Sequence, residues 1–105
     1  MKFIQTIAAV SVLAVSIVTP AFAQSAGGAT YKAKCQMCHG ADGQPTATGK
    51  SMKALPFNAP ELTKASNATL IASIMNGKGR MPAYAGKLTD SQIKDVVAYI
   101  RTLQK

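Results

Sequence analysis

The sequence predicts an all-α domain with three to four helices and long loops, and two observations support this prediction. Apolar residues recur at helical spacing in three stretches, whereas the strict alternation typical of strands is absent. Large apolar side chains are also scarce. Residues 24–105 contain twelve Leu, Ile, Val and Phe residues, about 15%, and charged chains below roughly 20% are usually disordered. Something other than side chains must therefore complete the core.

Three helices are expected from their ends and their apolar faces. The first covers approximately residues 28–36. The second follows Ser66 as its N-cap and stops at residues 76–77, an Asn-Gly pair typical of helix ends. The third is the clearest, because Thr89 and Gln92 fit a capping box. Its apolar face repeats at helical spacing through Ile93, Val96, Val97, Ile100 and Leu103.

The segment between the first and second helices is mostly loop. Residues 41–59 are rich in Gly, Pro, Thr and Ser, and a short helical turn is expected at residues 60–64, where Pro60 occupies the first helical position. A loop this long within a small domain needs something to wrap around. The sequence thus predicts a helical chain whose core is completed by a bound group rather than by its own side chains.

The first 23 residues have the pattern of a cleaved secretory signal peptide. Lys2 gives a positive start, residues 7–18 form an apolar run, and residues 21–23 form an A-x-A cleavage site. The run is shorter than the roughly 20 residues that a membrane span needs. We therefore expect residues 1–23 to be removed and residues 24–105 to work in the periplasm, without stable membrane insertion.

Both cysteines and the single histidine of the chain lie within five residues. Cys35, Cys38 and His39 form a C-x-x-C-H motif, which is typical of covalent attachment of one haem c. Two thiols at this spacing form thioethers with the two vinyl groups of one macrocycle, and the imidazole becomes the proximal iron ligand. The motif therefore predicts both the cofactor and the missing centre.

Three other interpretations of the motif are weaker. A thioredoxin-like C-x-x-C follows a strand in a βαβ unit, and no strand is predicted before Cys35. A structural zinc site needs four ligands, whereas Cys and His offer three. A Cys35–Cys38 disulfide is compatible with export but leaves the small core unexplained.

The distal iron ligand is expected to be Met81. It lies in the segment 77–84, where two glycines permit close backbone approach and Pro82 stiffens the exit. Met52, in the long loop, is the alternative sulfur ligand, and an iron without a methionine ligand is the third possibility. Met37 is excluded because it sits between the tethering cysteines.

These motifs resemble those of class I c-type cytochromes, of the small bacterial monohaem kind. The likeness runs from Gly28 to Leu103 and rests on the C-x-x-C-H motif, GKGRMPAY around Met81, and LTDSQIKDVVAYIRTL at the C-terminus. The resemblance implies that the first and last helices cross near Gly28 and Tyr99, with Met81 as distal ligand. It also implies that a backbone carbonyl holds the other ring nitrogen of His39. Pro45 and Pro56 are both candidates for that carbonyl.

Coordination by His39 and Met81 leaves no open iron position, so one-electron exchange remains and no enzymatic activity is expected. The main hypothesis is a diffusible periplasmic electron carrier. Two alternative functions remain: a haem-binding subunit or sensor with a displaceable Met81, and a dedicated electron-accepting subunit of a dehydrogenase.

The chain is strongly basic, with twelve Lys and Arg against four Asp and Glu. Basic loop residues expected near the haem favour redox partner proteins with acidic docking surfaces. Nucleic-acid binding is not expected, because the basic residues are dispersed and no recognised motif is present. We expect a monomer. The loop cations are Lys50, Lys53, Lys78, Arg80 and Lys87.

Overall fold

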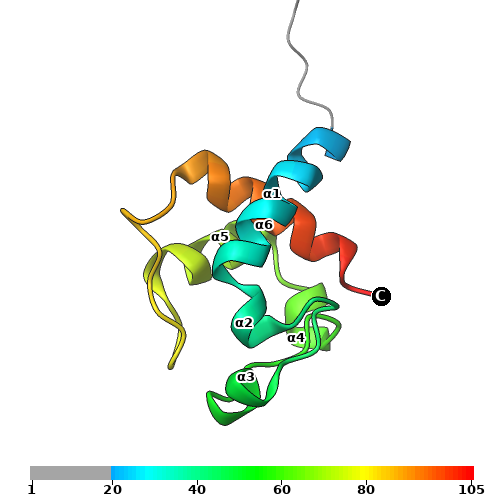
Figure 1. Cartoon of the computed structure of the whole chain (residues 1–105), viewed down its shortest axis with the longest axis vertical. Coiled ribbons are helices and arrows are strands. Elements are labelled where there is room, and N and C mark those ends of the chain that lie inside the picture. The colour runs from blue at the N-terminus through cyan, green and yellow to red at the C-terminus, as the bar shows by residue number, and fades with distance from the viewer. Residues whose placement is uncertain (1–19) are drawn as a thin grey trace, which may run out of the picture.

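The computed structural model describes residues 20–105, and its first and last helices cross near the centre of the molecule (Figure 1). No β-strand occurs in this part of the chain, which has two isolated bridges instead. The all-α prediction is confirmed. The helices are α1 (Pro20–Lys34), α2 (Gln36–His39), α3 (Ala47–Ser51), α4 (Pro60–Thr63), α5 (Asn67–Asn76) and α6 (Asp90–Thr102).

The later helices begin where their capping residues predict. The Ser66 hydroxyl accepts from the backbone N–H of Thr69 at 3.1 Å, which caps α5. Thr89 and Gln92 form the reciprocal capping box of α6, with distances of 3.1 and 2.9 Å. Pro60 occupies the first turn of α4. These local signals are sufficient because each uses side chains within one turn of the helix end.

The first half of the chain is more helical than expected. Helix α1 already includes Pro20, the first described residue, rather than starting near residue 28. Helix α2 follows it almost directly, because the Cys35 N–H still donates to the Tyr31 carbonyl at 2.8 Å. The loop prediction for residues 41–59 was wrong at α3. Thr46 caps this short helix by accepting from the Gly49 N–H at 3.2 Å. Its residues show no apolar periodicity, so the sequence gives no helical signal there.

The predicted signal peptide lies largely outside the described residues. Helix α1 runs through residues 20–23, across the expected cleavage point before Gln24. The residues that form the crossing, Gly27, Gly28 and Tyr31, all follow that point. Cleavage thus remains a prediction, and it would leave the helix crossing intact.

Helices α1 and α6 approach closely through two glycines. A Cβ on Gly27 would overlap the backbone carbonyl of Asp95, and one on Gly28 would lie 3.1 Å from the Tyr99 ring. The Tyr31 and Tyr99 rings pack beside this contact, with centroids 5.1 Å apart. The crossing near Gly28 and Tyr99 is therefore present, and its tightest point is Gly27, to which sequence reasoning gave no role.

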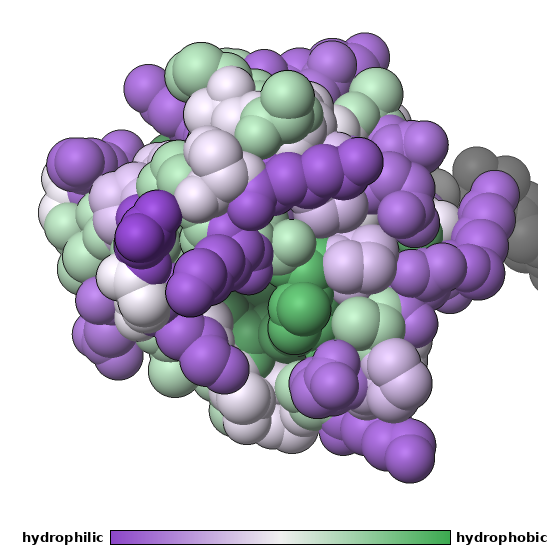
Figure 2. Space-filling model, turned by 90° about the horizontal axis from the view of Figure 1, so that it is seen from below, coloured by the Kyte–Doolittle hydropathy of each residue, from purple (hydrophilic) through white to green (hydrophobic). Residues whose placement is uncertain are grey.

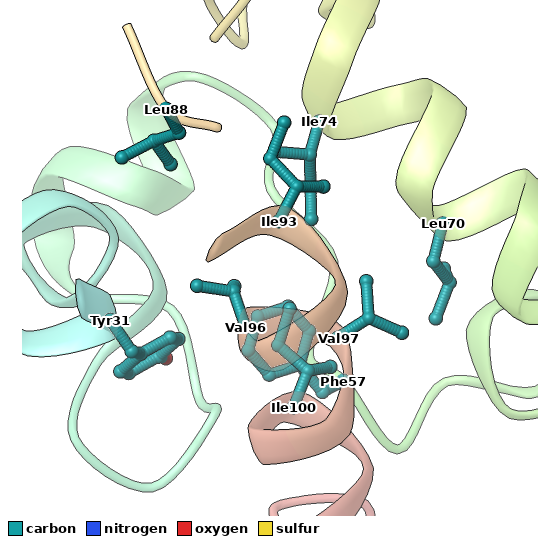
Figure 3. Packing of buried hydrophobic residues seen from close by; sticks show 9 residues of the cluster. All are labelled: Tyr31, Phe57, Leu70, Ile74, Leu88, Ile93, Val96, Val97 and Ile100. Atoms are coloured by element: carbon teal, nitrogen blue, oxygen red, sulfur yellow. The ribbon is translucent and has the colours of Figure 1, made fainter. Parts of the chain in front are cut away.

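The apolar core is small and is organised around α6 (Figure 3). Four residues of α6 lie between Tyr31 of α1 on one side and the apolar face of α5 on the other. This arrangement follows from the 3.6-residue period of α6, which places its apolar residues along one face. The buried hydrophobic residues are Tyr31, Phe57, Leu70, Ile74, Leu88, Ile93, Val96, Val97 and Ile100.

Tyr31 connects this core to the segment after α2. Its side chain is fully buried, and its hydroxyl donates to the Gly40 carbonyl at 2.5 Å. Burial raises the pKa of Tyr31 well above its usual value, and the nearby Cys35 acts in the same direction. The folded protein therefore holds this phenol neutral under alkaline conditions that ionise an exposed tyrosine.

Replacing Gly27 by Ala should destabilise the protein by about 1–3 kcal/mol, the usual cost of forcing extra atoms into a packed contact. The matched variant Gly28→Ala should cost less, because its new methyl meets the movable Tyr99 ring rather than backbone. Denaturant unfolding of the haem-loaded variants measures both free energies. Equal stabilities of the two variants would contradict the assignment of Gly27 as the tightest contact.

Replacing Tyr31 by Phe should lower the free energy of unfolding by about 1–2 kcal/mol near neutral pH, because the Gly40 carbonyl loses its donor. The folded-state pKa is raised, so the stabilisation from Tyr31 is fully present below the unfolded pKa of about 10 and declines above it. The gap between the two proteins should therefore narrow above about pH 10. Unfolding titrations at neutral and alkaline pH test this, and a constant gap would refute it.

Candidate haem-binding site

The short helix α2 places the three motif residues on one face. Cys35 is its N-cap, and Cys38 and His39 follow at the i+3 and i+4 positions, which lie together on a helix surface. The backbone N–H of His39 donates to the Cys35 carbonyl at 3.0 Å, so the turn is closed. Met37 points away from this face and is 77% exposed. The helical turn thus presents two thiols and one imidazole together.

This face lines a cavity of about 640 Å³, within the range of about 300–1,000 Å³ usual for small-molecule and cofactor sites. Figure 2 shows the molecule from the α3 and α4 side, with a hydrophobic hollow and mainly hydrophilic residues around its edge. The cavity extends from the motif to α5 and α6, beside the small core. Its apolar wall includes Phe57, Leu62, Leu70, Ile74, Val96 and Ile100.

Both candidate sulfur ligands lie on the same cavity. Met81 and Met52 each line it, and both side chains are half-buried. Met75 packs against the apolar core instead, and Met37 is outside the cavity. The structure thus brings Cys35, Cys38, His39 and Met81 to one cavity, and Met52 with them.

The turn that carries Met81 has a defined backbone. Lys78 and Met81 exchange backbone hydrogen bonds of 3.2 and 3.0 Å. Gly77 ends α5 with a φ of +76°, and a Cβ there would crowd the Met81 carbonyl. Tyr84 closes the other end of the turn, because its hydroxyl donates to the Lys34 carbonyl of α1 at 3.1 Å. The turn is therefore anchored next to the motif.

The His39 imidazole is buried against Phe57. The two rings stack with centroids 4.8 Å apart and planes inclined by 20°. Burial lowers the pKa of His39, which favours the neutral imidazole that binds metals. Its Nδ1 is buried, and no group of residues 20–105 accepts a hydrogen bond from it, so neither Pro45 nor Pro56 supplies the expected carbonyl here.

The two cysteines are free thiols in this structure. Burial, followed by the neighbouring Cys38, raises the pKa of Cys35 to about 11. Two unpaired thiols, a buried neutral imidazole and a large apolar cavity fit a covalently attached haem. A bare metal ion would instead need polar ligands around it, whereas most of this cavity wall is apolar.

Three residues that shape the site were not singled out from the sequence. Phe57 orients the imidazole ring, and Thr46 donates its hydroxyl to the Met37 carbonyl at 2.6 Å. Gly49 lets α3 approach α2, because a Cβ there would overlap the Cys38 carbonyl. All three act across the loop 41–57, where contacts depend on the tertiary fold. Their only sequence signal is the presence of Gly and a capping Thr in a Pro-rich loop.

Comparison with known proteins gives a consistent result. The family model for cytochrome c oxidase, cbb3-type, subunit III matches residues 22–100. Cytochrome c6 of Leptolyngbya boryana is 37% identical over 78 residues, which cover 72% of this chain and 87% of that protein. Cytochrome c6 of Thermosynechococcus vestitus is 33% identical over 101 residues, covering 94% of this chain and 88% of that protein.

A solved structure shows the same similarity. The KustC0563 c-type cytochrome superposes with a TM-score of 0.71 at 33% identity, covering 75% of this chain and 98% of that one. Within residues 20–105, no helix is both long enough and apolar enough to cross a membrane. The cofactor is therefore covalently bound haem c, with iron at its centre. The motif, the cavity, the fold and the related proteins agree, and the chain belongs to the small class I c-type cytochromes.

Proposed function

We propose that this protein is a periplasmic one-electron carrier that shuttles electrons between redox partners through a His39/Met81-ligated haem. One observation carries the proposal: the C-x-x-C-H turn and Met81 line a single apolar cavity. If His39 and Met81 both held the iron, with the macrocycle supplying its other ligands, no position would remain for a substrate. Electron exchange without turnover of a substrate is the function that remains, so we expect no enzymatic activity.

Each site residue has a distinct role in this proposal. The Cys35 and Cys38 thiols tether the cofactor by thioethers, so that a small protein retains it. The His39 imidazole provides the proximal nitrogen, and its stacking on Phe57 restrains the ring. The Met81 thioether is a neutral, soft ligand that favours ferrous over ferric iron and thereby raises the reduction potential. Bound haem supplies the Fe(III)/Fe(II) couple itself.

The cavity walls support rapid electron exchange. They are largely apolar, so the change in iron charge occurs in a medium with few dipoles to reorient. The turn of Met81 is held by backbone hydrogen bonds and by Tyr84, which limits ligand movement between oxidation states. A site that changes little on reduction exchanges electrons with a low reorganisation cost.

The edge of the cavity carries mostly positive charge. Four cationic residues line it, against the single carboxylate of Glu61. Lys50 and Lys87, also predicted from the sequence, are exposed but do not line the cavity. This charge supports docking of acidic redox partners at the cavity edge. The proposal also takes the protein to be a monomer with no role in nucleic-acid binding. The four cations are Lys34, Lys53, Lys78 and Arg80.

The periplasmic location rests on the predicted signal peptide. The Lys2 start, the apolar run and the A-x-A site together favour export and cleavage before Gln24. The proposal includes no membrane anchor after cleavage.

Replacing Met81 by Ala should abolish the weak red absorption band of the ferric iron–sulfur bond and lower the reduction potential. It should also open a coordination position, so that the ferrous variant binds carbon monoxide at neutral pH whereas the parent protein does not. The matched variant Met52→Ala should keep the band. If the band persists in Met81→Ala and disappears in Met52→Ala, then Met52 is the ligand. Carbon monoxide binding by the parent would favour a sensor.

Electron exchange with a small anionic oxidant such as hexacyanoferrate should become slower as ionic strength rises, because salt screens the cationic cavity edge. The double variant Lys34→Gln and Lys53→Gln should weaken this dependence. Lys94→Gln with Lys32→Gln, which removes the same charge from residues that do not line the cavity, should weaken it less. Stopped-flow rates over a range of salt concentrations test this, and equal slopes for both double variants would exclude a local docking site.

A further inference from the structure

The Met81 turn is firmly held at one end and weakly held at its tip. At the firm end, the Tyr84 backbone N–H donates to the Ile74 carbonyl at 2.9 Å, and its hydroxyl reaches Lys34. At the tip, Gly79 has open space around it and Arg80 is exposed. Met81 itself packs against the apolar core, so a contact from the tip of the turn to another segment would restrain it further.

One hydrogen bond supplies that contact. The Arg80 guanidinium donates through Nη1 to the Ser51 carbonyl at 3.0 Å, across 29 residues of sequence. Among the hydrogen bonds of residues 20–105, it is the one that joins residues 78–82 to another segment. No backbone N–H in this part of the chain donates to the same carbonyl, since Ser51 ends α3. The contact thus satisfies an acceptor that the helix leaves free.

The position of this hydrogen bond links it to the iron ligand. Arg80 directly precedes Met81, and Ser51 directly precedes Met52, and both methionines line the cavity. The bond therefore joins two segments of the cavity edge, the Met81 turn and the end of α3. Helix α3 is itself fixed to the motif, because Gly49 packs on Cys38 and Thr46 binds the Met37 carbonyl. Arg80 connects the distal turn to the proximal side of the site.

We propose that Arg80 is a positioning residue that holds the Met81 turn over the cavity and slows replacement of the Met81 sulfur by outside ligands. This inference rests on the proposed role of Met81 as the distal ligand. An arginine suits this role, because its planar group offers several N–H donors in a fixed geometry and stays charged at every physiological pH. Lys78, in the same turn and on the same cavity, carries the same charge without this hydrogen bond.

The test measures ligand exchange in the haem-loaded protein. Ferric parent protein, Arg80→Ala, Lys78→Ala and Arg80→Lys are mixed with imidazole, and loss of the red iron–sulfur band is followed in time. A hydrogen bond of ordinary net strength corresponds to an acceleration of about 2- to 10-fold in Arg80→Ala. Lys78→Ala should stay within about two-fold of the parent, because it removes charge but no hydrogen bond. Arg80→Lys keeps a donor and should exchange more slowly than Arg80→Ala.

The outcomes distinguish the Arg80–Ser51 hydrogen bond from a general effect of positive charge near Met81. An Arg80→Ala rate within two-fold of the parent, or a Lys78→Ala rate equal to that of Arg80→Ala, would overturn the proposal. Circular dichroism of each variant identifies any that has lost its fold, and Arg80→Lys then carries the comparison with the parent. A parent protein without a Met81-dependent red band would instead overturn the ligand assignment. Failure of this inference and failure of the proposed function are thereby distinguishable.

Discussion

The close crossing of α1 and α6 is the contact on which the other parts of the site depend. Gly27 lets the two backbones meet, and the apolar face of α6 is then held against Tyr31. Because α2 follows α1 almost without interruption, the same crossing sets the direction in which Cys35 and His39 face. A small shift of α1 relative to α6 would therefore also displace Cys35 and His39 at the cavity.

The cavity also explains how so few large apolar residues support a fold. Within residues 20–105 the buried cluster has nine members, and its face toward the motif borders the cavity rather than more protein. A cofactor in that space would bury apolar surface on both sides at once, and such burial is the main driving force for folding. We therefore expect cofactor binding and folding to be coupled in this chain.

Local signals were sufficient for the parts of the structure that are set within one or two turns. Ser66, Thr89 and the C-x-x-C-H motif each act through neighbours a few residues away, so the starts of α5 and α6 and the grouping of the motif residues follow from the sequence. Gly27, Gly49 and Phe57 act through partners on other elements, and no single sequence reveals those partners. The same limit applies to the choice between Met81 and Met52, since both lie in turns whose position is set by contacts elsewhere.

The exposure of Met37 has a consequence for how such a protein can diversify. Its side chain lies between the two attachment cysteines, yet it projects away from the cavity and contributes nothing to the buried cluster. The surface next to the attachment point can therefore change its shape, polarity or charge one residue at a time without disturbing the fold. A carrier with this architecture can acquire a new recognition surface close to its redox centre while its stability and its iron ligands stay the same.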